Sequence, residues 1–528
     1  MKTISFHPKV AEFPVVKNKT GYLYPKIIFK KFIFKAIYRY LQFSYRLLML
    51  HPSLMKLRYA KGFEKARWNA GKIKAWGIYL MAQKNVPAYK KFYKNVPGNN
   101  ELLKTRLPEL TYIPETDKEN YVKKYSIAER CKKGVIPFSG IVFDESSGSS
   151  GIPTNWLRSL KEREENQKII RMAVNILIPD KNKFIINSFA LGPWATGMNI
   201  SFAFEKTNLL KSLGPDERKI VNTLKLFGTD YHYLIMGYPP FLKNLSDNKN
   251  LDWAKYKVTF IFGGEAMSEP MRRYILDKGV KKVYGSYGAS DLDLNLSAEN
   301  DFTISLRKIL LENKNLAKRL LKHDGAIPMI FQYNPADFFI ETNSESELLI
   351  TLCRNSYLAP KVRYNIHDLG QIVRLPELES ILKEFNLSVS DIGELKTDLP
   401  FLFHYGRADM AVAYYGCKVK PGDLQECIFK IGDLGNVVNG FSIKTVENER
   451  CVKKLIIDIE LKHGLDPEKY NDGSYLYDLI AKLKEINQDF RESIRMVPAE
   501  GFPELHFHKF HSQHFSENDY RIKNKYIF

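Results

Sequence analysis

The feature that most constrains the fold is a series of short apolar segments, beginning near Val135, that alternate with helical patterns. The apolar segments read GVIPFSGIVF, FIINSFAL, YHYLIMGY and KVTFIFGG, and a helical pattern, SEPMRRYILDKG, follows the last of them. Short and continuously apolar segments are typical of strands that are buried on both faces. Their alternation with helices predicts parallel β-α-β layers, so we expect a fold of the α/β class.

The pattern changes twice toward the C-terminus. Residues 347–375, from ELLITL to GQIVRL, predict a further β-rich unit. After HYGRADM the sequence predicts a hairpin, a helix, a strand, a second helix and a last strand, ELHFHKF, which together suit a small α+β domain. Because 528 residues are too many for one core, we expect three parts. They are a basic, partly amphipathic helical extension over residues 1–84, a large domain over 85–406 and a small domain over 407–528.

Composition excludes several classes of protein. Apolar residues make up 44% of the chain and aromatic residues 13%, as in globular proteins and unlike disordered or collagen-like ones. The first residues, MKTISFHPKVAEFPVV, lack the apolar core and the cleavage site of a signal peptide. The cysteines form no C-x-x-C pair, which gives no zinc signature and suits free thiols in a reducing compartment; they are Cys131, Cys353, Cys417, Cys427 and Cys451. We therefore expect a cytoplasmic protein.

The net charge of +21 is concentrated in one segment. Between Pro14 and Asn100 the chain has 19 Lys or Arg residues and a single acidic residue, Glu64, whereas the remainder is nearly balanced. Such a segment can meet nucleic acid, an anionic membrane or an acidic protein. No recognised nucleic-acid module occurs in the sequence, so we expect no nucleic-acid partner.

The segment from Ile27 to Leu50 predicts a basic amphipathic helix. One stripe at helical spacing is polar and the wider opposite face is apolar; the stripe comprises Lys30, Lys31, Lys35, Arg39, Gln42 and Arg46, and the apolar face includes Phe29, Ile33, Ile37, Tyr40, Phe43 and Leu47. Two interpretations are open: the helix packs against its own protein, or it lies on the inner membrane surface. Lysines interrupt it too often for a helix that spans a bilayer, which needs about 20 apolar residues in a row.

A serine- and glycine-rich segment follows the first predicted strand. Residues 144–156, DESSGSSGIPTNW, contain four serines and two glycines. Backbone N–H groups and hydroxyls at this density can surround an anion. The segment has neither the Walker spacing with its lysine nor the G-x-S-x-G of a nucleophile elbow. Taken alone, such a segment is more typical of a flexible linker, so its context must decide.

That context is a set of further blocks in a fixed order along the chain. They read VPAYKKFY (86–93), FGGEAM (262–267), YGASD (287–291), VRYNIHDLG (362–370), YGRADM (405–410) and YGCKVKPGDLQECI (415–428). Together with the serine-glycine segment they resemble the acyl-adenylate-forming enzymes, whose phosphate loop reads S-S-G-T-T-G-x-P-T. Thr154, after the proline, is typical of their phenylacetate–CoA ligase-like branch. The resemblance extends from about residue 85 to about residue 430.

The resemblance implies a large domain that binds ATP and the acyl group, followed by a small mobile domain. The phosphates would be held by Ser146, Ser147, Gly148, Ser149, Ser150 and Gly151. Gly264 and Glu265 would flank the adenine, and Tyr287, with Gly288 beside it, would stack on it. Ser290 would bond the α-phosphate, and Asp368 would accept the ribose hydroxyls. Arg407 would supply positive charge near the phosphates, and the small domain would turn about Asp409.

Two positions depart from the family pattern. Asp291 stands where the family has a glutamate that binds Mg²⁺, and its shorter side chain would move the metal or add a water. The C-terminal segment, SENDYRIKNKYIF, lacks the glycine of the family's G-K-x-x-R. Lys523 would be the family's catalytic lysine and Lys525 is the second choice, while the alternative is a charged, frayed terminus. Without the resemblance, solvated turn residues and a surface ion pair would explain Asp291, Asp368 and the Arg407–Asp409 pair.

The function that the resemblance implies is the ATP- and Mg²⁺-dependent activation of an aryl or fatty acid to an acyl-adenylate. Transfer to coenzyme A, or to the phosphopantetheine of an acyl carrier protein, would follow. Three alternatives are open: transfer to an amine, transfer of AMP to a cofactor, and a catalytically retired protein of the membrane surface. They differ in whether pyrophosphate is released and in which acceptor is consumed.

Two further features are ambiguous. Trp194, in FALGPWATGMNISF, lies where the family builds its acyl pocket, although such an apolar stretch suits a core equally well. Four histidines near the C-terminus have spacings at which metal ligands occur; they are His506, His508, His511 and His514. One face of a strand with the loop that follows explains them better, because no constellation of cysteines or acidic residues accompanies them.

Overall fold

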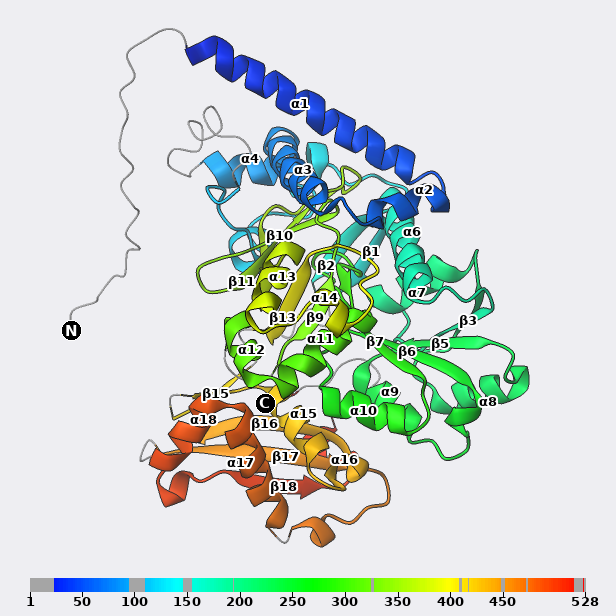
Figure 1. Cartoon of the computed structure of the whole chain (residues 1–528), viewed down its shortest axis with the longest axis vertical. Coiled ribbons are helices and arrows are strands. Elements are labelled where there is room, and N and C mark those ends of the chain that lie inside the picture. The colour runs from blue at the N-terminus through cyan, green and yellow to red at the C-terminus, as the bar shows by residue number, and fades with distance from the viewer. Residues whose placement is uncertain are drawn as a thin grey trace, which may run out of the picture.

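The protein is described by a computed structural model that covers residues 23–94, 110–145, 154–192, 194–323, 327–407, 411–415, 417–447, 452–471, 473–516 and 526. Figure 1 shows a large part that contains a long sheet and a smaller part, formed by the C-terminal residues, that packs against one side of it. The N-terminal helices lie on the opposite side of the large part.

The helices and strands have the following bounds. The α-helices are α1 (Leu23–Leu48), α2 (Pro52–Lys56), α3 (Glu64–Asn85), α4 (Pro87–Lys94), α6 (Leu160–Leu177), α7 (Ala195–Phe204), α8 (Glu217–Phe227), α9 (Pro239–Ser246), α10 (Glu269–Asp277), α11 (Asp301–Glu312), α12 (Lys314–Leu320), α13 (Leu375–Glu384), α14 (Val389–Ile392), α15 (Pro421–Lys430), α16 (Leu434–Val437), α17 (Ser474–Ile486) and α18 (Gln488–Ser493). The strands are β1 (Ile141–Glu145), β2 (Asn155–Ser159), β3 (Lys183–Asn187), β4 (Leu209–Ser212), β5 (His232–Gly237), β6 (Lys257–Gly263), β7 (Lys282–Tyr287), β8 (Ser297–Ala298), β9 (Met329–Gln332), β10 (Phe338–Thr342), β11 (Glu347–Leu352), β12 (Tyr364–Val373), β13 (Phe401–Arg407), β14 (Val412–Tyr414), β15 (Cys417–Val419), β16 (Val438–Glu447), β17 (Lys453–Leu461) and β18 (Glu504–His508). Short helical turns include η1 (Leu57–Tyr59), η2 (Lys118–Val122) and η8 (Gln513–Phe515).

Eleven strands of the described residues form one sheet, in the order β10-β11-β12-β13-β9-β8-β7-β6-β5-β3-β4. The half from β4 to β7 is parallel, and the half from β8 to β10 is antiparallel. The expected α/β class is therefore confirmed, with helices between consecutive parallel strands. The β-rich unit predicted at residues 347–375 supplies β11 and β12, which continue the same sheet.

The first predicted strand is wrong in its extent and in its place. Residues 135–140 form no strand, and β1 pairs with β2 in a separate two-stranded sheet. Phe143 of β1 is 46% exposed, so its apolar character does not mark a core strand. The two strands are close in sequence, and a short connection makes their pairing inexpensive in chain entropy.

The C-terminal part has a hydrophobic core of its own, which includes residues from Val412 to Tyr526. Its strand β17 pairs antiparallel with β16 and parallel with β18. The predicted hairpin, helices and strands occur in the predicted order as β14–β15, α15, β17, α17 and β18. The sequence prediction lacks β16, whose segment VNGFSIKTVE contains the asparagine and glycine that are depleted in strands.

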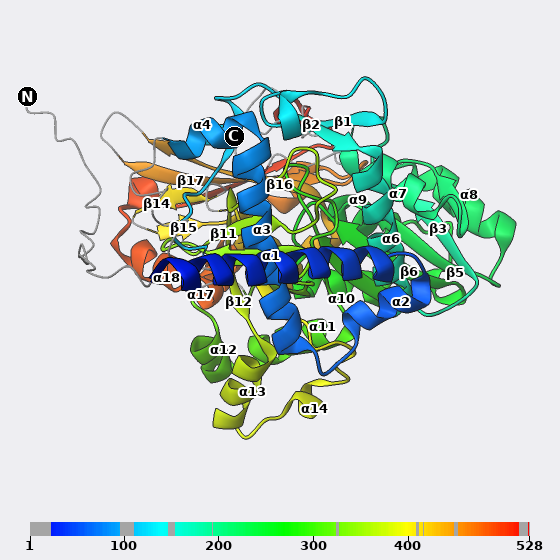
Figure 2. The same cartoon turned by 90° about the horizontal axis from the view of Figure 1, so that it is seen from above.

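The N-terminal helices divide into an inner and an outer element. Trp76, Ile78 and Tyr79 of α3 belong to the same apolar cluster as residues of the large sheet. Helix α1 crosses α3 on the outside of the molecule (Figure 2). Among the described residues, no helix combines the length and the apolar character that crossing a membrane requires.

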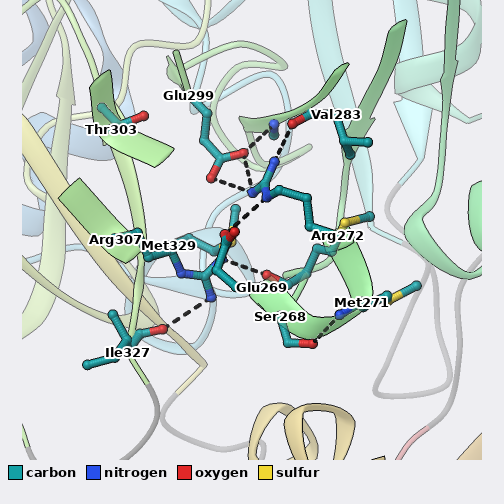
Figure 3. Close-up of polar contacts among 12 residues, drawn as sticks. Ser268, Glu269, Met271, Arg272, Val283, Glu299, Thr303, Arg307, Ile327 and Met329 are labelled. Atoms are coloured by element: carbon teal, nitrogen blue, oxygen red, sulfur yellow. Dashed lines mark hydrogen bonds and ion pairs between the residues drawn. The ribbon is translucent and has the colours of Figure 1, made fainter. Parts of the chain in front are cut away.

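A buried network of two arginines and two glutamates lies between β7, α10 and α11 (Figure 3). Arg272 donates to both carboxylate oxygens of Glu299 at 2.8 Å, and to Glu269 at 3.0 Å. Arg307 donates to the same Glu269 oxygen at 2.9 Å and to the main-chain oxygen of Met267 at 2.7 Å. Glu299 also accepts from the main-chain N–H of Gly285 at 2.6 Å. The network therefore fixes β7 and the turn after β6 to the two helices.

Substitution of Arg272 tests this role. Because removal of one partner leaves buried charges unpaired, we expect Arg272→Leu to lower the free energy of unfolding by about 3–5 kcal/mol. The neighbouring Arg273 is exposed, so Arg273→Leu is a matched control with an expected change below about 0.5 kcal/mol. Urea unfolding of both variants measures the difference, and equal stabilities would contradict the role of the network.

Candidate active site

The predicted site residues meet at one edge of the large sheet. Strands β6 and β7 are parallel neighbours, so the turns that follow them leave the sheet at the same edge. On the antiparallel side, Asp368 of β12 and Arg407 of β13 are paired across the two strands. Eight of the predicted residues line one cavity of about 1130 Å³; they are Gly264, Glu265, Tyr287, Gly288, Ser290, Asp291, Asp368 and Arg407.

The carboxylate of Asp368 is the polar centre of this edge. Its Oδ2 accepts a hydrogen bond of 2.7 Å from the hydroxyl of Tyr287 and lies 3.1 Å from Nε2 of His404. The rings of Tyr287 and His404 are 4.5 Å apart between centroids. Asp368 is buried within β12, so the alternative of a solvated turn residue is wrong for this position.

The protonation states of Asp368 and Tyr287 follow from this contact. Burial acts to raise the pKa of Asp368, but the hydrogen bonds from His404 and Tyr287 and the charge of Arg407 hold it below its usual value. Burial, together with the Asp368 charge, raises the pKa of Tyr287 well above its usual value. At neutral pH the pair is therefore a carboxylate and a phenol that donates to it, and such a carboxylate can also accept hydroxyl groups of a ligand.

The turn after β7 requires a glycine at position 288. A Cβ atom there would lie 2.3 Å from the main-chain oxygen of Leu294. The turn is closed by the N–H of Ala289, which donates to the main-chain oxygen of Asp293 at 3.0 Å. This tight path brings Ser290 and Asp291 to the cavity wall.

Asp291 lies between a hydroxyl and a cation. Its Oδ2 accepts a hydrogen bond of 2.8 Å from the hydroxyl of Tyr364 and lies 3.7 Å from Nζ of Lys118. Tyr364 begins β12 and Lys118 begins η2. All three residues line the cavity, so Asp291 is a wall residue with defined partners.

Two further basic residues, Lys361 and Arg158, lie in or beside the β1–β2 hairpin. Nζ of Lys361 lies 4.3 Å from the ring centroid of Trp156 and 4.6 Å from that of Tyr364. Burial lowers the pKa of Lys361 well below its usual value. Arg158 of β2 donates to the main-chain oxygens of Ser290 and Leu292, at 2.5 and 2.6 Å. The hairpin is thus attached to the turn that carries Asp291.

The serine-glycine segment itself, residues 146–151, lies outside the described residues. The residues on either side of it are described. Glu145 and Asn155 are paired at the end of the β1–β2 hairpin, and Glu145 lines the cavity. The last residue described before the segment, Glu145, is therefore part of the cavity wall.

The cavity has an apolar region in addition to the polar one. Its lining there comes from α6, α7, β5, β6 and the segment that precedes α7; these residues include Ile170, Val174, Leu177, Phe189, Trp194, Ile200, Met236, Tyr238 and Ile261. Most of them belong to, or pack against, one apolar cluster behind the sheet. Trp194 therefore contributes to the cavity wall.

The small part of the chain closes the cavity on another side, where Lys418, Lys420 and Gln425 line it. The hydroxyl of Tyr526 donates to Oε2 of Glu265 at 2.7 Å. The main-chain oxygen of Tyr526 accepts from the N–H of Ile443 at 2.7 Å. The C-terminal segment thus links β16 to the turn after β6. The predicted lysines, at 523 and 525, and the predicted hinge residue, Asp409, lie outside the described residues.

Polar contacts hold the two parts together beside the cavity. Lys243 of α9 donates to the main-chain oxygen of Val438 at 2.8 Å, and Lys462 of the small part lies 2.6 Å from Asp247. Nζ of Lys243 also lies 3.2 Å from the Asp247 carboxylate. Burial lowers the pKa of Lys243 to about 7, although the Asp247 charge opposes the shift.

This pKa predicts a pH dependence of stability. Between pH 7 and the ordinary lysine pKa of about 10.4, the unfolded state binds the proton and the folded state does not, so folding becomes more favourable as the pH rises. Below pH 7 both states are protonated and this dependence disappears. We expect Lys243→Met to remove it, so that the stability of the natural protein relative to the variant increases by roughly 2 kcal/mol from pH 7 to 9.

Thermal unfolding at a series of pH values measures this difference. Lys278→Met is the matched control, because Lys278 also contacts Asp247, at 3.8 Å, but is far more exposed. That variant should keep the pH slope of the natural protein. A natural slope in Lys243→Met would contradict the lowered pKa.

The four C-terminal histidines surround an acidic residue. His506 and His508 lie on β18, whereas His511 and His514 follow it. Nε2 of His508 is 2.7 Å from the Asp458 carboxylate, and ligand atoms of Asp458, His506 and His508 lie within 4.8 Å of one another. The premise that no acidic constellation accompanies the histidines is therefore wrong, because the fold brings Asp458, which is distant in sequence, next to them. Lys444 also lies 3.8 Å from this carboxylate, which makes Asp458 the centre of an ion-pair cluster.

Several residues of the site were not among the sequence predictions. They are Lys118, Arg158, Lys361, Tyr364 and His404. Tyr364 and His404 lie inside or beside matched blocks, so their positions offered a signal, but the blocks do not show which side chain faces the cavity. Lys118 and Arg158 are brought to the site only by the tertiary path of η2 and β2.

Comparisons with known proteins identify the fold. No protein-family model matches the sequence, and no curated protein matches it. Among solved structures, 2-hydroxyisobutyryl-CoA ligase in the postadenylation state, in complex with 2-HIB-AMP, overlaps with a TM-score of 0.63 at 12% identity, over 89% of this chain and 91% of that chain. The same ligase in the thioesterification state, with 2-HIB-AMP and CoA, gives 0.51 at 12% identity over the same shares of both chains. The chain therefore has the fold of the adenylate-forming enzymes, and its overlap is larger with the postadenylation state.

Proposed function

We propose that this protein activates a carboxylic acid with ATP to form an acyl-adenylate and then transfers the acyl group to a thiol. The observation that carries the proposal is the cavity in which eight residues predicted to bind ATP or its Mg²⁺ ion lie beside an apolar lining. The shared fold supports it, because the overlapping structures are those of a CoA ligase bound to an adenylate and, in another state, also to CoA. We also propose the phenylacetate–CoA ligase-like branch, on the ordered sequence blocks.

Nucleotide binding is assigned to the polar end of the cavity. The hydroxyls and N–H groups of residues 146–151 would hold the phosphates, beginning at Glu145 on the cavity wall. Asp368 would accept the ribose hydroxyls, since Tyr287 and His404 keep it ionised and oriented. Gly264 and Glu265 would flank the adenine, with Tyr287 and Gly288 on its other side.

A divalent metal fits the donors beside Asp291. This carboxylate lines the cavity, and carboxylate oxygen is the ligand that Mg²⁺ prefers. Asp291 would hold the ion against the phosphates, where it offsets negative charge. Tyr364 orients the carboxylate through its 2.8 Å hydrogen bond. Lys118, 3.7 Å from Asp291, adds a second positive charge on the same side.

The first step is an in-line displacement at phosphorus. An oxygen of the substrate carboxylate attacks the α-phosphorus, the bond to the bridging oxygen breaks, and pyrophosphate leaves. Arg407 and Ser290 would offset the charge that develops on the α-phosphate, and the cavity would hold the two reactants in line. Lys523, with Lys525 as second choice, would contact the reacting groups from the C-terminal segment.

The second step is acyl transfer. A thiol of coenzyme A, or of a carrier-protein phosphopantetheine, loses its proton and attacks the acyl carbon, and AMP departs. The small part, residues 407–528, would turn about Asp409 between the two steps, away from the large part over residues 85–406. The polar contacts with α9 and the turn after β6 would break in this rearrangement. Peripheral contact of the basic N-terminal segment with the inner membrane surface belongs to the same proposal.

Pyrophosphate release tests the first step. With ATP, Mg²⁺ and a panel of aryl and fatty acids, we expect release with one class of acid, and coenzyme A should increase turnover. Asp368→Asn should raise KM for ATP about tenfold or more, because it removes the acceptor charge for the ribose. Asp391→Asn is the control, since Asp391 is exposed outside the cavity. No release with any acid would contradict the proposal.

The C-terminal lysine is tested by separating the two half-reactions. Lys523→Ala should lower adenylate formation by about 100-fold or more, since it removes a positive charge from the developing transition state. It should leave thioester formation from added acyl-adenylate unchanged. Lys525→Ala is the matched comparison, two residues away. If it alone abolishes adenylation, the assignment of Lys523 is wrong.

A further inference from the structure

Helix α1 carries two opposite apolar faces. The inner face holds Phe34, Tyr38 and Tyr45, and it packs on the protein. The outer face holds a second row of large apolar side chains, each at least 40% exposed; they are Ile33, Ile37, Tyr40, Phe43 and Leu47. The spacings of four, three, three and four residues place this row along one side of the helix. Tyr40 and Phe43 are about two-thirds exposed, at 67% and 65%.

Contacts of the inner face fix the rotation of α1 about its own axis, so the outer face does not turn toward the core. The ring of Tyr38 lies against Gly77 of α3, where an added Cβ would approach it to 2.2 Å. The hydroxyl of Tyr38 donates to Asn355 at 2.7 Å, and Gln42 donates to the main-chain oxygen of Cys353 at 3.4 Å. The row on the opposite side therefore faces away from α3. Figure 2 shows that α1 itself lies on the outside of the molecule.

The exposed apolar surface continues beyond the end of α1. Leu50, Leu54 and Leu57 follow at the corner formed by α2 and η1, and Leu50 is 72% exposed. Large apolar side chains that are exposed in a row, rather than singly, are typical of an interaction site. We call this surface, from Ile33 to Leu57, the outer apolar face.

Positive charge borders the outer apolar face. Lys35, Arg39 and Arg46 are exposed on α1 itself, along one edge of the apolar row. No acidic residue occurs in the chain from Pro14 to Phe63, and the segment to Asn100 has a single one. An apolar row with a cationic border is the pattern of helices that lie in the interface of an anionic bilayer.

The apolar region of the cavity leads toward the same corner. Tyr59 of η1 and Ile176 of α6 line the cavity. Both also pack against a small apolar cluster that contains Tyr45 and Met49 of α1 and Met55 of α2. The cavity wall and the corner under the outer apolar face are thus built from the same group of side chains.

We propose that the outer apolar face docks the protein on an anionic membrane surface, and that the acid it activates is a long-chain carboxylic acid held in that membrane. The part that concerns the acid depends on the proposed function, whereas the docking does not. A bilayer would cover the row from Ile33 to Leu57, contact Lys35, Arg39 and Arg46 through its headgroups, and present the apolar chain beside Tyr59 and Ile176.

Vesicle flotation with the full-length protein tests the docking. The protein should float with vesicles of phosphatidylglycerol and phosphatidylcholine, at least tenfold more than with phosphatidylcholine alone, and salt should weaken the binding. The double variant Phe43→Glu/Leu47→Glu should lose at least tenfold of this binding. Leu226→Glu/Tyr477→Glu is the matched control, because these two apolar residues on α8 and α17 are at least as exposed as Phe43 and Leu47, at 75% and 68%.

The outcomes separate docking from other occupants. Unchanged thermal unfolding in both double variants would show that the fold is intact. Equal flotation of the two double variants, or no binding of the natural protein to anionic vesicles, would overturn the docking. A dimer in sedimentation that only Phe43→Glu/Leu47→Glu dissociates, without vesicle binding, would assign the face to a second copy instead.

The substrate is tested separately from the surface. Pyrophosphate release should be faster with a long-chain acid embedded in anionic vesicles than with the same amount of acid in detergent, and Phe43→Glu/Leu47→Glu should abolish this difference. The variant should keep its rate with short, water-soluble acids. Release with short acids only would overturn the substrate assignment and leave the proposed adenylation intact. Release with no acid would instead contradict the proposed function, while flotation would still decide the docking.

Discussion

The buried pairing of Arg272 and Arg307 with Glu269 and Glu299 is the constraint on which the active-site edge depends. Two positive and two negative groups are removed from water together, and each finds its partners within about 3 Å. Removal of any one of them would leave an uncompensated charge in the interior. Since the same groups bind Gly285 and Met267 through the main chain, the positions of Tyr287 and of the turn at Gly264 follow from the network.

The cavity brings together groups that differ in electrostatic character. At Asp368, hydrogen bonds from His404 and Tyr287, together with the charge of Arg407, keep a buried carboxylate ionised. Lys361, near the hairpin, has its pKa lowered by burial instead. A cavity with a buried carboxylate at one end, basic residues beside the β1–β2 hairpin and an apolar region beyond suits the ligand of the proposed function, which would carry hydroxyls, a phosphate and an apolar group. An acyl-adenylate is such a ligand.

The corner from Tyr45 to Tyr59 connects the outer apolar face with the cavity wall. The corner from Tyr45 to Tyr59 packs against α6, and α6 in turn forms part of the cavity wall. A helix that only capped the protein would bury its one apolar face and present polar residues to water. Helix α1 instead keeps a second apolar row outside, which is the surface that the proposed docking would cover. This explains why its apolar content exceeds what packing on α3 requires.

The sequence by itself determined the α/β class, the order of the C-terminal elements and many of the residues that line the cavity edge, because these depend on local periodicity and on short blocks of residues. Short, continuously apolar segments such as FIINSFAL and KVTFIFGG are typical of buried strands, and the glycine at position 288 is required by a local turn. Only the tertiary structure decided that β1 leaves the main sheet, that Asp458 joins the histidines, and that His404 and Lys118 reach the cavity. It also decided which apolar face of α1 is buried, since amphipathic spacing is the same for a face that meets α3 and for one that meets solvent. Contacts between residues far apart in the chain depend on which elements pack together, and local periodicity shows that a face is apolar but not which element it meets.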